Sequence, residues 1–376
     1  MAKSRKKRPL IEQAASTVIQ EPESNETTRP TGARPLRILA LDGGPAALLV
    51  VLMLTDLEER VPGFLANVDV IAGTSAGAIT GLMLATKANP EFMLPVAANF
   101  WRDEQSYYKN SLLGYVKAFA GVGPFNDSNY VQQFLSQGGV LADRKLKDLA
   151  KWVILTSFDI SAGQVLVSAK SPLNWRPKIF QNMGPDRDDQ EMLAVDAALC
   201  SSASPIVTAV HRGKVDGGLV ANNPSMIAIA EVFQEGMRPT AAAVQFPRDH
   251  QGIVMLSVGG GRADEAFKVS DANWGYFQWL LNPLNPLLLL NGFLSGTTEA
   301  IVMESEQILD KPKFRRLDPF YTEHGLLPFV QADPRKQQRT AESAMTQELI
   351  QETAEWLQTC GWLQDLPEAA TAAIGG

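Results

Sequence analysis

Cysteine, histidine and long hydrophobic runs are all scarce in this chain of 376 residues, and each scarcity argues against a class of protein. The two cysteines, Cys200 and Cys360, stand far apart, which argues against a disulfide framework and suits a reducing compartment. With three histidines in all, any catalytic site that needs an imidazole has few candidates. The formal net charge of −7 argues against nucleic acid as a partner, because binding phosphates needs a basic surface.

No segment reads as a membrane-spanning helix or as a secretory signal. Residues 279–294 are strongly apolar, but Pro283 and Pro286 interrupt this short stretch. The first eight residues, MAKSRKKR, are basic, and no uninterrupted apolar run follows them. We therefore expect a cytoplasmic or peripheral membrane protein with neither a cleavable signal peptide nor a transmembrane helix.

The polarity of the chain changes abruptly near residue 36. Residues 1–35 are rich in Lys, Arg, Glu, Ser, Thr and Pro without periodicity, which predicts a flexible basic and polar tail. Residues 36–310 are predicted to form one domain. Within it, the apolar runs at residues 36–41 and 68–74 are typical of strands, and each is followed by a glycine turn and an apolar helix. This alternation predicts parallel strands with helices packed on the sheet. Residues 311–376 are expected to form a partly helical extension on the same domain.

Further elements follow from local patterns. Strands are predicted at residues 152–160, 164–169, 177–182 and 252–261, and helices at residues 193–207 and 341–358. The glycines that end the strand at residues 252–261 are typical of the sheet edge where α/β proteins bind ligands.

Ser75 lies in the turn Gly73-Thr74-Ser75-Ala76-Gly77, between a predicted strand and a predicted helix. A nucleophilic serine needs exposure at a strand end, small neighbours that permit a strained turn, and amides directed at the developing oxyanion. The turn supplies the small neighbours, and the helix that starts near Ala76 supplies amides. A purely structural glycine turn is the alternative interpretation, and the strand and helix on either side favour the nucleophile.

The base that would accept the proton of Ser75 has two kinds of candidate. In the usual α/β-hydrolase order of Ser, acid and His, the histidine would be His211, His250 or His324, and none of them lies in a convincing loop. Asp216 begins a turn in the stretch VDGG, and a carboxylate beside a serine can act as a base if the site raises its pKa. On local sequence alone, a simple Asp-Gly-Gly turn is the favoured interpretation.

Three separated segments together resemble the patatin-like phospholipases. They are residues 38–44 (ILALDGG), 70–85 (VIAGTSAGAITGLMLA) and 215–232 (VDGGLVANNPSMIAIAEV), and residues 257–262 (SVGGGR) and 314–319 (FRRLDP) are also similar. The resemblance implies a three-layer α/β/α fold with a central, mostly parallel sheet. It also implies that Ser75 is the nucleophile of a serine–aspartate dyad with Asp216, without a catalytic histidine, a metal or an organic cofactor.

The resemblance is imperfect in the loop that would form the oxyanion hole. The expected donors are the amides of Gly43, Gly44 and Ala76. The family pattern is Asp, three glycines, a variable residue, Arg or Lys, and Gly, whereas this chain has Pro45 in place of the third glycine and Ala47 in place of the basic residue. Proline has no amide hydrogen, and the loss of one oxyanion donor lowers turnover on the order of 100-fold to 1000-fold.

Aromatic residues mark a candidate region for contact with lipid. Trp274, Phe277 and Trp279 precede a leucine cluster, which suits an apolar lid or an interfacial rim, and a core helix pair broken at the prolines is the alternative. The basic residues of the tail suit anionic lipid headgroups or a merely solvated terminus. These residues are Lys3, Arg5, Lys6, Lys7 and Arg8.

Together these patterns predict a lipid acyl hydrolase that releases fatty acids from phospholipids or related lipid esters through Ser75 and Asp216. Its expected partners are the lipid substrate and, transiently, a membrane surface. A weakly active or inactive lipid-binding or regulatory protein, suggested by Pro45 and Ala47, is the alternative.

Overall fold

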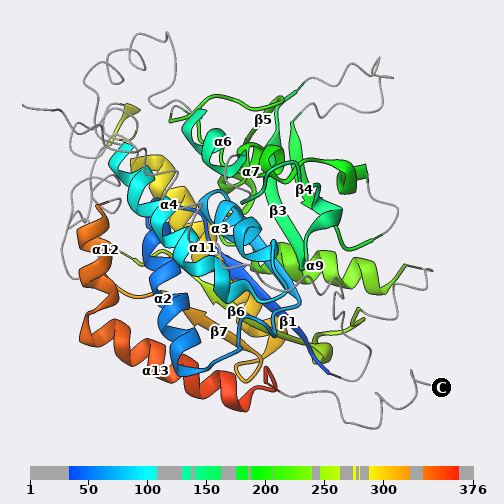
Figure 1. Cartoon of the computed structure of the whole chain (residues 1–376), viewed down its shortest axis with the longest axis vertical. Helices are drawn as coiled ribbons and strands as arrows, with labels where there is room; N and C mark the ends of the chain where they lie inside the picture. The colour runs from blue at the N-terminus through cyan, green and yellow to red at the C-terminus, as the bar shows by residue number, and fades with distance from the viewer. Residues whose placement is uncertain are drawn as a thin grey trace, which may run out of the picture.

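A seven-stranded sheet forms the centre of the part of the chain that the structure describes (Figure 1). Its strands are β1 (Leu36–Leu41), β2 (Val70–Thr74), β3 (Trp152–Asp159), β4 (Arg176–Gln181), β5 (Lys214–Asp216), β6 (Ile253–Val258) and β7 (Phe314–Leu317). The order is β4-β3-β2-β1-β6-β7, with β5 also paired to β3. Neighbouring strands are parallel from β3 through β2, β1 and β6 to β7. Strands β4 and β5 run antiparallel to β3.

This computed structural model describes only part of the chain. The described residues are 34–107, 129–136, 140–161, 175–184, 188–205, 207–238, 246–262, 274–276, 279, 288–321 and 333–363. Within them, no helix combines the length and the apolarity needed to cross a membrane.

The central strands are buried on both faces. In β1, Ile38 and Ala40 join one hydrophobic cluster, whereas Leu39 and Leu41 join another on the opposite face. Side chains alternate between the faces of a strand, so a continuous apolar run is the pattern of a sheet covered on both sides.

Helices cover each face and complete three layers (Figure 1). One face is packed by α2 (Ala47–Arg60), α3 (Ala76–Ala85), α4 (Leu94–Tyr107) and α13 (Ala344–Thr359), and the other by α9 (Ser225–Gly236) and α11 (Leu288–Leu309). Shorter helices are α6 (Asn129–Ser136), α7 (Ala194–Ser201), α8 (Gly218–Ala221) and α12 (Pro334–Ala341). The predicted three-layer α/β/α fold with a mostly parallel sheet is confirmed.

Two predicted helices have different bounds in the structure. The helix predicted at residues 193–207 ends at Ser201, shortly before Pro205, because the residue that precedes a proline disfavours helical geometry. The helix predicted from residue 341 begins at Ala344 as α13, because the side chain of Ser343 caps it by accepting from the amide of Thr346. The strand predicted at residues 164–169 lies outside the described residues.

The predicted domain boundary near residue 310 stays a prediction. Strand β7 lies beyond it and is hydrogen-bonded to β6, and α13 packs against the cluster that also holds α2.

Candidate active site

Ser75 occupies a strained turn between β2 and α3. Its backbone angles are φ 53° and ψ −117°, a region that residues other than glycine rarely adopt and that concentrates at functional sites. The residue is half-buried, while every residue of α3 behind it is buried. The turn therefore presents a reachable hydroxyl at the carboxyl edge of the sheet, in front of a helix N-terminus.

Gly77 explains why the turn is so tight. A Cβ atom at this position would lie 2.2 Å from the carbonyl oxygen of Leu41 and 2.5 Å from that of Asp42. Only glycine lets the first turn of α3 approach the end of β1 this closely. The glycine motif in the sequence is thus the steric condition for placing Ser75 beside the loop after β1.

Strand β3 brings Asp216 to Ser75. In the parallel register, Thr74 of β2 lies opposite Thr156 of β3, and the next residue of β3, Ser157, lies opposite Asp216 of β5. The hydroxyl of Ser75 donates to Oδ2 of Asp216 over 2.8 Å. The two residues are 141 positions apart in the chain and meet because β2 and β5 pair with consecutive residues of β3.

Asp216 is a buried carboxylate with neutral donors around it. Its Oδ1 accepts from the amide of Gly218 over 2.7 Å, and its Oδ2 accepts from Ser75. Burial raises the pKa of Asp216 from 3.8 to about 6, against the two hydrogen bonds, which lower it. Asp216 is thus ionised at neutral pH and far more basic than an exposed aspartate, which suits the acceptor of a serine proton.

The histidines bond to other residues where the structure describes them. His211 bonds through Nε2 to Oδ1 of Asp196 at 2.9 Å, and His250 bonds through Nε2 to Gln251 at 2.8 Å. His324 lies outside the described residues. The hydroxyl of Ser75 bonds to a carboxylate directly, without an imidazole between them.

The expected oxyanion donors differ in their hydrogen bonding. The amide of Gly43 donates to the carbonyl of Asn222 over 3.0 Å and is therefore already occupied. The amides of Gly44 and Ala76 make no hydrogen bond to a described residue. Gly44, with a φ of 128°, and its neighbour Pro45 are both exposed ahead of α2. Gly44 and Ala76 are the better candidates for an oxyanion hole.

Residues beyond position 310 hold the loop between β1 and α2, residues 42–46, which we call the oxyanion loop. The sequence patterns did not predict these contacts. Arg316 of β7 donates to both carboxylate oxygens of Asp42 over 2.9 and 2.5 Å. Gln337 of α12 accepts from the amide of Leu49 over 2.9 Å and donates to the carbonyl of Pro45 over 3.3 Å. Only the similarity of residues 314–319 to the family marked Arg316, and no local signal marked Gln337.

Ser201, at the end of α7, is a second residue that the sequence patterns did not single out. Its hydroxyl accepts from the amide of Ser75 over 2.9 Å, and its carbonyl accepts from the amide of Gly217 over 2.9 Å. The residue is completely buried. One residue therefore ties the turn of Ser75 to the turn of Asp216.

The predicted lipid-contact residues lie only partly within the described residues. Trp274 and Trp279 stack edge to face with their ring centroids 5.2 Å apart, and Trp279 is exposed. Phe277 lies outside the described residues. Closer to the site, Leu294 of α11 lies 3.5 Å from where a Cβ atom on Gly218 would stand, and its neighbour Phe293 is 63% exposed.

Comparison with known proteins gives a family and several relatives. The sequence model of the family described as "Patatin-like phospholipase" matches residues 39–229. Patatin-like protein 2 of Oryza sativa subsp. indica is 25% identical over 300 residues, which cover 69% of this chain and 70% of that protein. The cGAMP-activated phospholipase of Vibrio cholerae serotype O1 is 30% identical over 243 residues, covering 60% of this chain and 64% of that one.

Among solved structures, VipD from Legionella pneumophila aligns with 86% of this chain and 68% of its own, at a TM-score of 0.35 and 11% identity.

Proposed function

The chain belongs to the patatin-like phospholipase family and so to the lipid hydrolases, and from that membership we propose that it releases fatty acids from phospholipids or related lipid esters through Ser75 and Asp216. The observation that carries the proposal is the 2.8 Å hydrogen bond from a reachable, strained serine to a buried carboxylate. A serine hydroxyl is a poor nucleophile until a neighbouring base takes its proton, and Asp216 is the group in position to do so.

The proposed reaction has two halves. Oγ of Ser75 attacks the carbonyl carbon of the ester while its proton passes to Oδ2 of Asp216, and the amides of Gly44 and Ala76 hold the negative oxygen. The lysolipid oxygen leaves with that proton, and the acyl group stays on Ser75 as an ester. A water molecule then gives a proton to Asp216 and attacks the acyl carbonyl, so that the fatty acid leaves and Ser75 takes its proton back.

Labelling with a fluorophosphonate serine probe, together with fatty-acid release from mixed phospholipid vesicles, tests this proposal. Both signals are expected from the native chain, and both are expected to vanish in Ser75→Ala. Ser202→Ala is the matched control, because the hydroxyl of Ser202 donates to the carbonyl of Ala198 and makes no hydrogen bond to Ser75 or Asp216. Labelling that persists in Ser75→Ala would overturn the assignment of the nucleophile.

We further propose that the dyad opens toward a lipid surface. Leu294 of α11 lies against Gly218, and Leu219, Leu289 and Phe293 near it are exposed apolar residues. Apolar side chains around a site strengthen binding at a membrane interface. Phe293→Asp is expected to slow hydrolysis of vesicles several-fold and to leave hydrolysis of a soluble short-chain ester unchanged. An equal loss on both substrates would contradict surface contact.

A weakly active lipid-binding or regulatory protein is the second candidate, because Pro45 cannot donate to an oxyanion. Pro45→Gly adds an amide beside Gly44 at an exposed position. If the amides of Gly44 and Ala76 suffice, turnover is expected to rise less than tenfold. A rise on the order of 100-fold or more, the size of one lost oxyanion donor, would favour this second candidate.

A further inference from the structure

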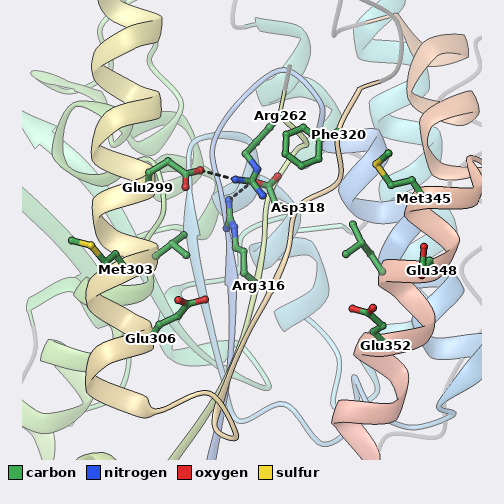
Figure 2. Close-up of a pocket in the computed structure, with 12 residues that line it drawn as sticks. Arg262, Glu299, Met303, Glu306, Arg316, Asp318, Phe320, Met345, Glu348 and Glu352 are labelled. Atoms are coloured by element: carbon green, nitrogen blue, oxygen red, sulfur yellow. Dashed lines mark hydrogen bonds and ion pairs between the residues drawn. The ribbon is translucent and has the colours of Figure 1, made fainter. Parts of the chain in front are cut away.

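An open groove of about 620 Å³ lies at the edge of the sheet, away from the dyad. Helix α11 forms one wall and α13 the other, and Arg316 and Asp318, in and just after β7, form the floor (Figure 2). Strand β7 ends the strand order, so one row of its backbone N–H and C=O groups has no strand partner among the described residues. The groove therefore combines an open strand edge with two walls of side chains.

The two walls carry facing carboxylates. Glu299 and Glu306 extend from α11, and Glu348 and Glu352 from α13 (Figure 2). Glu299 bonds to Arg262 over 3.2 Å, and Glu352 bonds to Arg315 over 2.6 Å.

Glu306 and Glu348 differ from these two, because neither has a cationic partner among the described residues. Two uncompensated negative charges thus lie on opposite walls of the groove. A positively charged occupant is favoured there, and an anionic one is disfavoured.

Exposed apolar side chains lie between the acids. Met303 of α11 is 55% exposed, Met345 of α13 is 46% exposed, and Phe320 at one end is 44% exposed. Flexible methionines suit the docking of an irregular apolar segment. The groove is therefore suited to a peptide that carries both cations and apolar side chains.

We propose that this groove binds the N-terminal segment of the same chain, residues 3–11. That segment has the sequence KSRKKRPLI, which places five cations directly ahead of Pro, Leu and Ile. Its charge and its apolar end complement the two kinds of groove side chain. The proposal concerns a separate surface and does not depend on the hydrolysis proposed above.

The point where the tail joins the sheet makes the groove reachable. Arg34 is paired with Asp69 at 2.7 Å, next to the start of β1, and β1 is two strands from β7. The path from Arg34 to the groove therefore crosses two strand spacings, about 10 Å, and follows the length of one six-residue strand, about 20 Å. The 22 residues between Ile11 and Arg34 have a root-mean-square span of roughly 25 Å as a coil, so the tether holds the segment near the groove at high effective concentration.

Zero-length carbodiimide coupling of the full chain, read by mass spectrometry, tests the contact because it joins only amines and carboxylates that touch. Lys3, Lys6 or Lys7 is expected to couple to the groove glutamates, which are Glu299, Glu306, Glu348 and Glu352, and less so at high salt. The double variant E306Q with E348Q leaves Glu299 and Glu352 able to react, and coupling of the tail lysines to these two is expected to fall as well, because the unpaired charges that hold the tail are gone. The matched control is E304Q with E355Q, two exposed glutamates on the same helices that do not line the groove, and it is expected to keep the coupling.

Three outcomes would overturn the proposal. Unchanged coupling of the tail lysines to Glu299 or Glu352 in the groove variant, or coupling mainly to carboxylates outside the groove, would show that Glu306 and Glu348 do not hold the tail. Coupling only between differently isotope-labelled chains would make the occupant a second copy. Absence of coupling, combined with tail-dependent binding to anionic vesicles that the groove variant leaves unchanged, would make the tail a membrane contact. Circular dichroism of each variant verifies that the fold is intact.

Discussion

Two buried aspartates stand at the carboxyl edge of the same sheet, and they differ in what faces them. Asp42, after β1, is held by the guanidinium of Arg316, which also bonds to Asp318 and Ser257. Asp216, at the end of β5, accepts only from the hydroxyl of Ser75 and the amide of Gly218 among the described residues. Burial raises the pKa of each to about 6, although Arg316 pulls that of Asp42 down.

The comparison teaches that a raised pKa does not by itself identify a base. The proton acceptor must also face a group that can release a proton during the reaction. Arg316 keeps its proton at all working pH values, so Asp42 is in a position to anchor the oxyanion loop. The hydroxyl of Ser75 releases its proton on attack, so Asp216 is in a position to act in catalysis.

The sharpest way to break the comparison is Asp216→Asn. The amide oxygen of asparagine can still accept from the amide of Gly218, but its NH2 group can only donate to the hydroxyl of Ser75 and cannot take the proton, so turnover is expected to fall on the order of 1000-fold or more. The midpoint of thermal unfolding is expected to stay or rise, because a buried charge is removed. Fatty-acid release and calorimetry measure the two effects. A variant that keeps a tenth of native turnover would refute Asp216 as the base.

Arg316→Met tests the other half of the comparison. It leaves Asp42 and Asp318 buried without their shared cation, and breaking a buried pair in this way costs about 3–5 kcal/mol of unfolding free energy. Urea denaturation measures the loss. Arg315→Met is the control, since Arg315 pairs with the exposed Glu352 and is expected to cost under about 1 kcal/mol. Equal losses in the two variants would contradict an anchoring role for Arg316.

Ser201→Ala sharpens the comparison at the serine. It leaves the part-buried amide of Ser75 without its acceptor, at a cost of about 1 kcal/mol or more. Because that bond holds the strained turn, kcat is expected to fall on the order of tenfold with little change in KM, and fluorophosphonate labelling is expected to slow in parallel. Ser201→Thr retains a hydroxyl and is expected to recover part of the rate. A change confined to thermal stability would make Ser201 purely structural.

The pH dependence is the smallest effect and separates the two carboxyl groups. Asp216 accepts a proton only when ionised, so kcat is expected to fall below about pH 6 and to be roughly tenfold lower near pH 5. Both carboxyls bind protons more tightly in the folded chain, so each lowers stability as pH rises from 3.8 to about 6. In Asp42→Asn the fall of kcat below about pH 6 should occur at the same pH. A shift in that pH would assign the ionisation to Asp42.

Much of the site was predictable from short patterns. The turn around Ser75 was predicted because a strand, two glycines and an apolar helix are local features, and the three-layer fold followed from their repetition. Asp216 was predicted only with the help of the family resemblance, because Asp-Gly-Gly alone is typical of an ordinary turn. Its proximity to Ser75 depends on the register of β3 with two other strands, and no local pattern encodes that register.

The sequence by itself determined which residues form strands and helices, where the chain turns at glycine, and that one serine lies at such a turn. These properties depend on side-chain volume, polarity and backbone freedom over a few neighbouring residues. Only the tertiary structure decided that Asp216 faces a hydroxyl while Asp42 faces a guanidinium, that Gly43 is occupied by Asn222, and that Arg316 and Gln337 hold the oxyanion loop. Burial and hydrogen bonding between distant segments set these contacts, and both arise only when the sheet assembles.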